Sequence, residues 1–183
     1  MRAVEEFDLI HRRYRDVFGA SLAPSFSSYM HRGCSNEHGA ALGYKRAGDE
    51  PLFLEAYLDE PVEEAVSHAV RRPVSRDRIV EIGNFAADNV IAMVSLWGAA
   101  ANDLAGLSEY AVATLTQPLR RMFSRIGVPV IPVASALPER LPQGTGDWGS
   151  YYQLDPWVCT GNIAEGQNAL TAFLRRRQRV AAA

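Results

Sequence analysis

The stretch from Arg78 to Asp88 reads RIVEIGNFAAD and lies near the middle of the chain. Its apolar residues are mostly β-branched or aromatic, and a short apolar run of this kind is typical of a buried strand. Two polar residues, Glu81 and Asn84, nevertheless lie within it. Because successive side chains of a strand point to opposite faces, these two are expected on opposite sides of the sheet, unless a bulge at Gly83 redirects one of them.

The segments around this strand alternate between helical and extended patterns. Asp88 and Asn89 are candidate caps for a long helix that follows the strand, and Pro61 suits the first turn of another helix. Two prolines confine the strand at 128–133 to an edge or a distorted position, and Pro138–Asp147 reads as a loop. Helices are expected at residues 4–18, 62–70, 90–104 and 117–125 and within 164–183, which ends in a frayed tail. Strands are expected at 25–31, 40–46, 52–57, 78–85, 111–116, 128–133 and 157–163.

This order predicts a mixed α/β sheet with helices on both faces. The strand, helix, strand and helix within residues 78–126 form a right-handed crossover unit on general grounds. A ligand is expected at the carboxyl ends of its strands. Since no repeat and no linker divides residues 1–183, the sequence predicts a single domain.

Composition narrows the possible functions. With 48% hydrophobic and 22% charged residues, the 183-residue chain can bury a proper core. A net charge of -2 gives no drive toward nucleic acid polymers or anionic membranes. No apolar run approaches the roughly 18 residues of a membrane span, and the charged N-terminus lacks a signal region. Cys34 and Cys159 offer neither a disulfide framework nor metal-ligand spacing, so a cytoplasmic protein without a metal is expected.

Three segments resemble the bacterial thermostable hemolysin family. They are EIGNFAA (81–87), TQPLRRMFSRIG (116–127) and WGSYYQLDPWVCTGNI (148–163), and the resemblance covers roughly residues 38–163. That family is similar in fold to the GNAT acyltransferases and more distantly to the acyl-homoserine-lactone synthases. The resemblance implies a GNAT-like, mostly antiparallel mixed sheet of seven strands. Its two central strands would splay apart around the pantetheine arm of a thioester donor.

One departure from the GNAT pattern bears on the donor. Acetyl-CoA users of that fold carry a Q/R-x-x-G-x-G/A loop after the central strand, whose amides hold a pyrophosphate. Residues 85–92 read FAADNVIA, with no glycine and with the acid Asp88. This favours a phosphopantetheine thioester on an acyl carrier protein, with no tightly bound cofactor. Acyl-CoA stays the alternative donor.

Three residues are candidates for the proton transfers of such a reaction. Glu81 would act as general base, because partial burial raises the pKa of a carboxyl group; the alternative is a structural ion pair with Arg78 or Arg120. Tyr151 and Tyr152, expected in extended chain with opposite orientations, would protonate the leaving thiolate or else only complete the core.

A second set of residues is expected to contact the donor. Asn84 would hydrogen-bond pantetheine, and the amides of Phe85 and Ala86 would polarise the thioester carbonyl. Thr116 precedes a helix N-terminus, where hydrogen-bond donors gather. Arg120 and Arg121 would dock an acidic carrier or hold a phosphate, or form a solvated basic face. The full set is Asn84, Phe85, Ala86, Asn89, Thr116, Arg120 and Arg121.

The sequence thus predicts an N-acyltransferase of bacterial specialised metabolism that acylates the amine of a small-molecule acceptor. Three alternatives stay open. The first is an acyl-CoA-dependent N-acetyltransferase, and the second is a module that binds an acyl carrier without catalysis. The third is a membrane-active, hemolysin-like protein whose basic C-terminal helix lies on an anionic surface.

Overall fold

Six strands form one sheet in the computed structural model, which describes residues 2–22, 25–34 and 37–181. The strands are β1 (Ser28–Cys34), β2 (Glu37–Arg46), β3 (Ile79–Ala87), β4 (Tyr110–Leu115), β5 (Ile131–Ser135) and β6 (Trp157–Asn162). Their order across the sheet is β1-β2-β3-β4-β6-β5, and every neighbouring pair is antiparallel except β3 and β4. The side chain of Cys34 lies outside the described residues.

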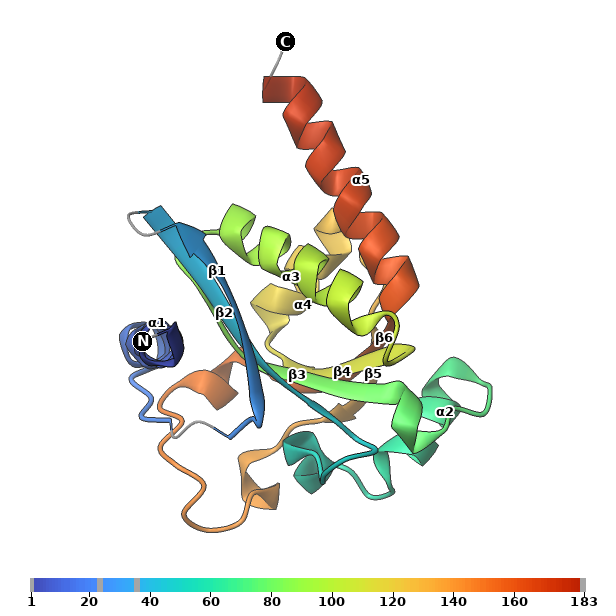
Figure 1. The fold of residues 1–183 in the computed structure, drawn as a ribbon. Coiled ribbons are helices and arrows are strands. Elements are labelled where there is room, and N and C mark those ends of the chain that lie inside the picture. Colours follow the sequence, from blue (N-terminus) through green and yellow to red (C-terminus); the bar gives the residue numbers. More distant parts are fainter. Residues whose placement is uncertain (1, 23–24, 35–36, 182–183) are drawn as a thin grey trace.

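Helices cover both faces of this sheet, as predicted (Figure 1). On one face α3 (Val90–Leu104), α4 (Gln117–Ile126) and α5 (Ile163–Ala181) enclose a core around Leu42, Val80 and Trp97. On the other face lie α1 (Arg2–Phe18) and α2 (Val62–Val70). No helix within the described residues is long and apolar enough to cross a membrane.

The crossover from β3 through α3 to β4 follows from its sequence. The side chain of Asn89 caps α3 by accepting a hydrogen bond from the Ala92 amide at 2.9 Å, as its residue type predicts. Val94, Leu96 and Trp97 bury the face of α3 that lies on the sheet. The helix returns the chain to β4, which runs parallel to β3.

The segment at residues 52–57 corrects a prediction, because it is a 3-10 helix, η1 (Phe53–Tyr57), and not a strand. Two carboxylates supply acceptors to its first amides. Glu55 accepts from Leu52 N at 2.9 Å, and Glu81 accepts from Phe53 N at 2.7 Å and Leu54 N at 3.1 Å. With η1 outside the sheet, the described residues contain six strands in place of the seven that the resemblance implied.

Two other elements differ from expectation. Strand β5 begins three residues later than predicted, although it does occupy an edge of the sheet, and its pairing with β6 shifts register between Pro132 and Ala134. Helix α5 continues to Ala181, so the tail is helical well beyond Leu174.

Candidate active site

The central strands β3 and β4 separate at their carboxyl ends. They pair only from Ile79 to Glu81 on β3 with Tyr110 to Val112 on β4, and both strands continue beyond that point. The gap leads to a cavity of about 460 Å³, here called the interstrand cavity. Its wall combines residues from the ends of both strands with parts of α1, α3 and α4. The splayed strands that the resemblance implied are therefore present.

A β-bulge lies where β3 passes this gap. Ala41 pairs with Ala86 and Gly43 with Gly83, so Asn84 and Phe85 together oppose Leu42. Asn84 has a φ of 50°, in the left-handed region that asparagine tolerates better than most residues. The bulge brings Asn84 to the same side as Glu81, whereas Phe85 packs on Trp97 across the other face. The simple alternation of a strand therefore fails here, and the bulge falls one residue after Gly83.

A small pocket beside the gap, here called the aromatic niche, has a volume of about 30 Å³. Glu81 and Asn84 both line it, together with the aromatic side chains of Tyr14, Phe26, Phe53, Tyr57, Trp148 and Tyr151. Gly83 makes room for one of these rings, because a Cβ at this position would lie 2.5 Å from Phe26 Cζ. The niche and the interstrand cavity share Tyr14, Phe85, Thr114 and Tyr151, so the two spaces adjoin.

Glu81 is a buried carboxylate with a structural partner and an altered pKa. Only 3% of the residue is exposed, and its two oxygens accept the hydrogen bonds from η1. Burial raises its pKa to about 7, while Lys45 on the neighbouring strand and the two amides oppose this shift. Within the described residues Glu81 forms no ion pair with Arg78 or Arg120. The structural role that it does have, capping η1, was not predicted.

Tyr151 and Tyr152 lie in a 3-10 helix, η4 (Tyr151–Leu154), and not in extended chain. Tyr151 lines both the niche and the interstrand cavity, and its hydroxyl donates to Thr114 O at 3.3 Å. Tyr152 is not among the lining residues; its hydroxyl lies 2.5 Å from that of Tyr57. Burial raises the pKa of both tyrosines, so their hydroxyls stay protonated near neutral pH. Of the two, Tyr151 faces the cavities.

The N-termini of α3 and α4 both reach the wall of the interstrand cavity, through Asn89 and Thr116. Phe85 and Ala86 lie at the same wall. Asp88 lies there too, but its carboxylate is engaged by the Gly39 amide at 2.8 Å and by Arg12 at 2.9 Å.

The arginines of α4 have different surroundings. Arg120 donates to Leu115 O at 2.7 Å and holds Asp155 through its carboxylate and its carbonyl, both at 2.6 Å. Its guanidinium thus ties α4 to the loop before β6. Arg121 and Arg125 are exposed. Neither Arg120 nor Arg121 is at the wall of the cavity, whereas Arg13 of α1 is.

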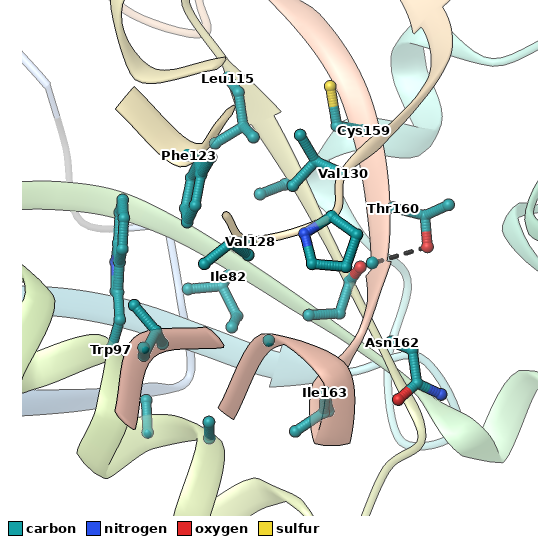
Figure 2. A pocket seen from close by; sticks show the side chains of 18 of the residues that line it. Ile82, Trp97, Leu115, Phe123, Val128, Val130, Cys159, Thr160, Asn162 and Ile163 are labelled. Carbon is teal, nitrogen blue, oxygen red and sulfur yellow. Dashed lines mark hydrogen bonds between the residues drawn. The ribbon is translucent and has the colours of Figure 1, made fainter. Parts of the chain in front are cut away.

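An apolar pocket of about 110 Å³ lies on the other face of the sheet, between α3, α4 and α5 (Figure 2). Trp97 and Phe123, which stack with ring centroids 4.0 Å apart, border it, as do Ile82 and Leu115. Cys159 also lines it, with a thiol whose pKa burial raises to about 11, so the thiol is protonated and unreactive. Phe85 borders this apolar pocket, the interstrand cavity and the niche.

Residues 1–167 match the sequence profile of the thermostable hemolysin family. The chain belongs to this family. No curated protein matches it in sequence. Its fold is similar to that of FeeM, an N-acyl amino acid synthase from uncultured soil microbes, at 14% identity and a TM-score of 0.56 over 92% of this chain and 94% of FeeM. It is also similar to the acyl-homoserine-lactone synthase LasI, at 16% identity and a TM-score of 0.56 over 91% and 88%.

A third structure of similar fold is BjaI, a CoA-dependent acyl-homoserine lactone synthase solved with SAM and isopentyl-CoA. It is 15% identical over 96% of this chain and 82% of BjaI, with a TM-score of 0.56. At these identities the likeness is one of fold, and it confirms the predicted mixed, mostly antiparallel sheet.

Sequence reasoning missed several residues of the site. Phe53, Tyr57 and Trp148 form much of the niche, and Arg13 reaches the interstrand cavity. The niche residues come from segments that are far apart in the chain, so no spacing signal connects them. Arg13 lies within the helix expected at residues 4–18, and nothing in the sequence distinguishes it from the other arginines of that helix.

Proposed function

We propose that this protein is an N-acyltransferase that moves an acyl group from a phosphopantetheine thioester to the amine of a small-molecule acceptor. The observation that carries this proposal is the gap between β3 and β4. Beyond Glu81 and Val112 the facing edges of these strands have no strand partner among the described residues. An extended arm with amide groups, such as pantetheine, can hydrogen-bond to such edges as an added strand does.

The surroundings of the gap suit the other parts of a donor. The N-termini of α3 and α4, together with Arg13, provide hydrogen-bond donors and positive charge for a phosphate at the wall of the interstrand cavity. The apolar pocket, which adjoins the gap at Phe85, can receive the acyl chain. A thioester carbonyl would then lie at the bulge, where the amides of Phe85 and Ala86 are candidates to polarise it.

We propose an acyl carrier protein as the source of the thioester. The segment that joins β3 to α3 contains no glycine. Asp88, with its partner Arg12, lies there just before α3. This arrangement suits the single phosphate of a carrier-bound arm better than the three phosphates of CoA. The exposed Arg121 and Arg125 of α4 add positive charge that an acidic carrier would recognise.

The chemical step needs one base and one hydrogen-bond donor. The amine nitrogen attacks the thioester carbonyl carbon, a C–N bond forms and the C–S bond breaks. Glu81, with a pKa of about 7, accepts the proton that the amine loses, and this proton afterwards returns to the thiolate product. Tyr151 turns its single hydroxyl hydrogen from Thr114 O to the leaving sulfur and donates a hydrogen bond to it. Tyr152 acts indirectly in this scheme, by holding Tyr57 at the niche.

Calorimetry with two donors tests the proposal. We expect a phosphopantetheinylated carrier protein to bind at least tenfold more tightly than its unmodified form and more tightly than CoA. Arg121→Ala combined with Arg125→Ala should weaken carrier binding, whereas the matched exposed pair Arg175→Ala and Arg176→Ala on α5 should not. Tight binding of CoA alone would replace the carrier by CoA as donor, and binding of neither would refute acyl transfer.

A further inference from the structure

The aromatic niche differs from the interstrand cavity in its chemistry. Its rings come from five segments of the chain. Several of them contact one another, with centroids 5.8 Å apart for Phe53 and Trp148 and 5.2 Å apart for Trp148 and Tyr151. Glu81 is the acidic residue at its wall. No Arg, Lys or His lines the niche within the described residues. The niche is thus rich in π-faces, carries one carboxyl group and has no cation.

Such a wall favours a positively charged ligand. The faces of aromatic rings carry negative potential and attract ammonium groups. One ring of the wall, that of Phe26, already interacts with an ammonium group, because Lys45 Nζ lies 5.5 Å from its centroid. Lys45 itself does not line the niche. Each oxygen of Glu81 accepts one hydrogen bond from η1, and a carboxylate can accept about four. Glu81 can therefore also accept N–H groups of a bound ammonium.

The size of the niche limits what else the ligand head can contain. A water molecule needs about 10–15 Å³ of such space, so about 30 Å³ holds a head of roughly two heavy atoms. An ammonium group and its methylene fit this space. The head of an α-amino acid adds a carboxylate, whose burial is costly unless a cation pairs with it. The indole nitrogen of Trp148 is buried without a partner among the described residues, but this neutral N–H cannot balance a charge.

We infer that the acceptor is a primary amine without an α-carboxylate, held as its ammonium form in the aromatic niche between Glu81 and the rings of Phe53, Tyr57 and Trp148. This inference rests on the proposed acyl transfer for the reaction, and it names the acceptor class. Before attack one N–H bond of the ammonium breaks and its proton passes through the Glu81 carboxylate to solvent. Glu81 is then again free to accept the second proton, which the nitrogen loses in the attack and which returns to the thiolate. The neutral nitrogen that results lies beside the gap where the thioester would be held.

Pairs of ligands that differ by one carboxylate test this inference directly. Calorimetry on the full chain, without any donor, would compare tyramine with tyrosine, 2-phenylethylamine with phenylalanine, and tryptamine with tryptophan. We expect at least one amine to bind tenfold or more tightly than its amino acid. Equal or tighter binding of the amino acids, or no binding of any amine, would overturn the inference.

Variants locate the binding site. Trp148→Leu removes a wall ring, and we expect it to weaken binding of the amine at least fivefold, as should Glu81→Gln. Trp157→Leu on β6 removes a tryptophan that borders neither the niche nor the two other cavities, so it is the matched control. Thermal unfolding of each variant verifies that it is folded. If Trp157→Leu and Trp148→Leu weaken binding equally, the amine does not bind in the niche.

Transfer assays separate this inference from the proposed function. Acylation of tyrosine, phenylalanine or tryptophan at the α-amine, with no acylation of the three amines, would leave the acyltransferase standing and overturn the acceptor class. Selective binding of amines without acylation from any thioester would refute the acyltransferase and leave the amine site standing.

Discussion

At the scale of single residues, each of the two polar side chains within β3 has a structural role. Glu81 caps η1 and borders the niche, while Asn84 takes the left-handed position of the bulge. Gly83 lies between them and leaves room for the ring of Phe26. Glu81, Gly83 and Asn84 thus serve the local backbone and the wall of the niche together, so substitutions of these three residues test stability as well as function.

The raised pKa of Glu81 predicts a change of stability with pH. The pKa of Glu81 is about 7 in the folded state and 4.5 in the unfolded state. Between these two pH values the folded state binds more protons than the unfolded state. The free energy of unfolding therefore falls as pH rises from 4.5 to 7. The shift corresponds to about 3 kcal/mol. Urea denaturation across this range should show the fall in the wild type, and Glu81→Gln should abolish this part of it.

Glu55 provides the matched control for this experiment. Its bonds to Arg76 lower its pKa to about 2, so its contribution is present above 4.5 and is lost as pH falls from 4.5 toward 2. Glu55→Gln should therefore alter the pH dependence only below about 4.5. Identical pH profiles for the wild type and Glu81→Gln between 4.5 and 7 would mean that Glu81 ionises normally.

A second residue-scale prediction concerns Gly83. Gly83→Ala places a Cβ 2.5 Å from Phe26 Cζ, and we expect the displaced ring to cost about 1–3 kcal/mol of unfolding free energy. Gly98→Ala is the control, because nothing lies within 4 Å of its added Cβ and alanine favours the helix interior. Combining Gly83→Ala with Phe26→Ala should cost less unfolding free energy than the sum of the two single changes, because the clash is then absent. No loss of stability in Gly83→Ala would contradict the close contact.

At the scale of elements, the W-G-S-Y-Y segment attaches η4 to the end of α1. Ser150 N donates to Phe18 O at 2.8 Å, and Gly149 has a φ of 52° with no room for a side chain, since a Cβ would lie 1.9 Å from the same oxygen. This contact sets Trp148 and Tyr151 against the niche. The glycine of the motif is therefore required by packing as well as by backbone conformation.

Gly149→Ala should detach η4 from α1. We expect it to lower the free energy of unfolding by several kcal/mol. Gly144 has a φ of 88°, and nothing lies within 4 Å of a Cβ added there. Gly144→Ala should therefore cost only the roughly 1–2 kcal/mol of an alanine in the left-handed region. Hydrogen exchange at the Ser150 amide measures the contact itself. Equal losses in the two variants would show that backbone strain alone accounts for the glycine.

At the scale of the whole molecule, the parts that sequence predicts are those governed by local pattern. Strand β3, the Asn89 cap and α3 all follow from residues within one segment. The failures share a different cause. Residues 52–57 become helical because Glu81, which is 28 and 27 positions away from the two amides that it accepts from, caps them. Tyr151 and Tyr152 lie in a 3-10 helix because Gly149 packs against the end of α1. The niche itself depends on such distant contacts, so no periodicity reveals it.

The arrangement of the three cavities around Phe85 predicts a limit on the acyl chain. A cavity of about 150 Å³ holds one benzene molecule, so an apolar pocket of about 110 Å³ holds a chain of fewer than about six carbons. Ala101 of α3 lines this pocket and is only partly buried. Ala101→Phe should fill it.

Each methylene that is kept from the pocket costs about 0.8 kcal/mol of binding, so Ala101→Phe should lower transfer of a hexanoyl group about tenfold or more and leave acetyl transfer nearly unchanged. Ala99→Phe, on the same helix but outside the pocket, should affect neither donor. The measurement is kcat/KM for both donors with one amine acceptor. An equal fall for acetyl and hexanoyl transfer would show that the chain does not enter this pocket, because only a chain long enough to pass Phe85 can meet the new side chain.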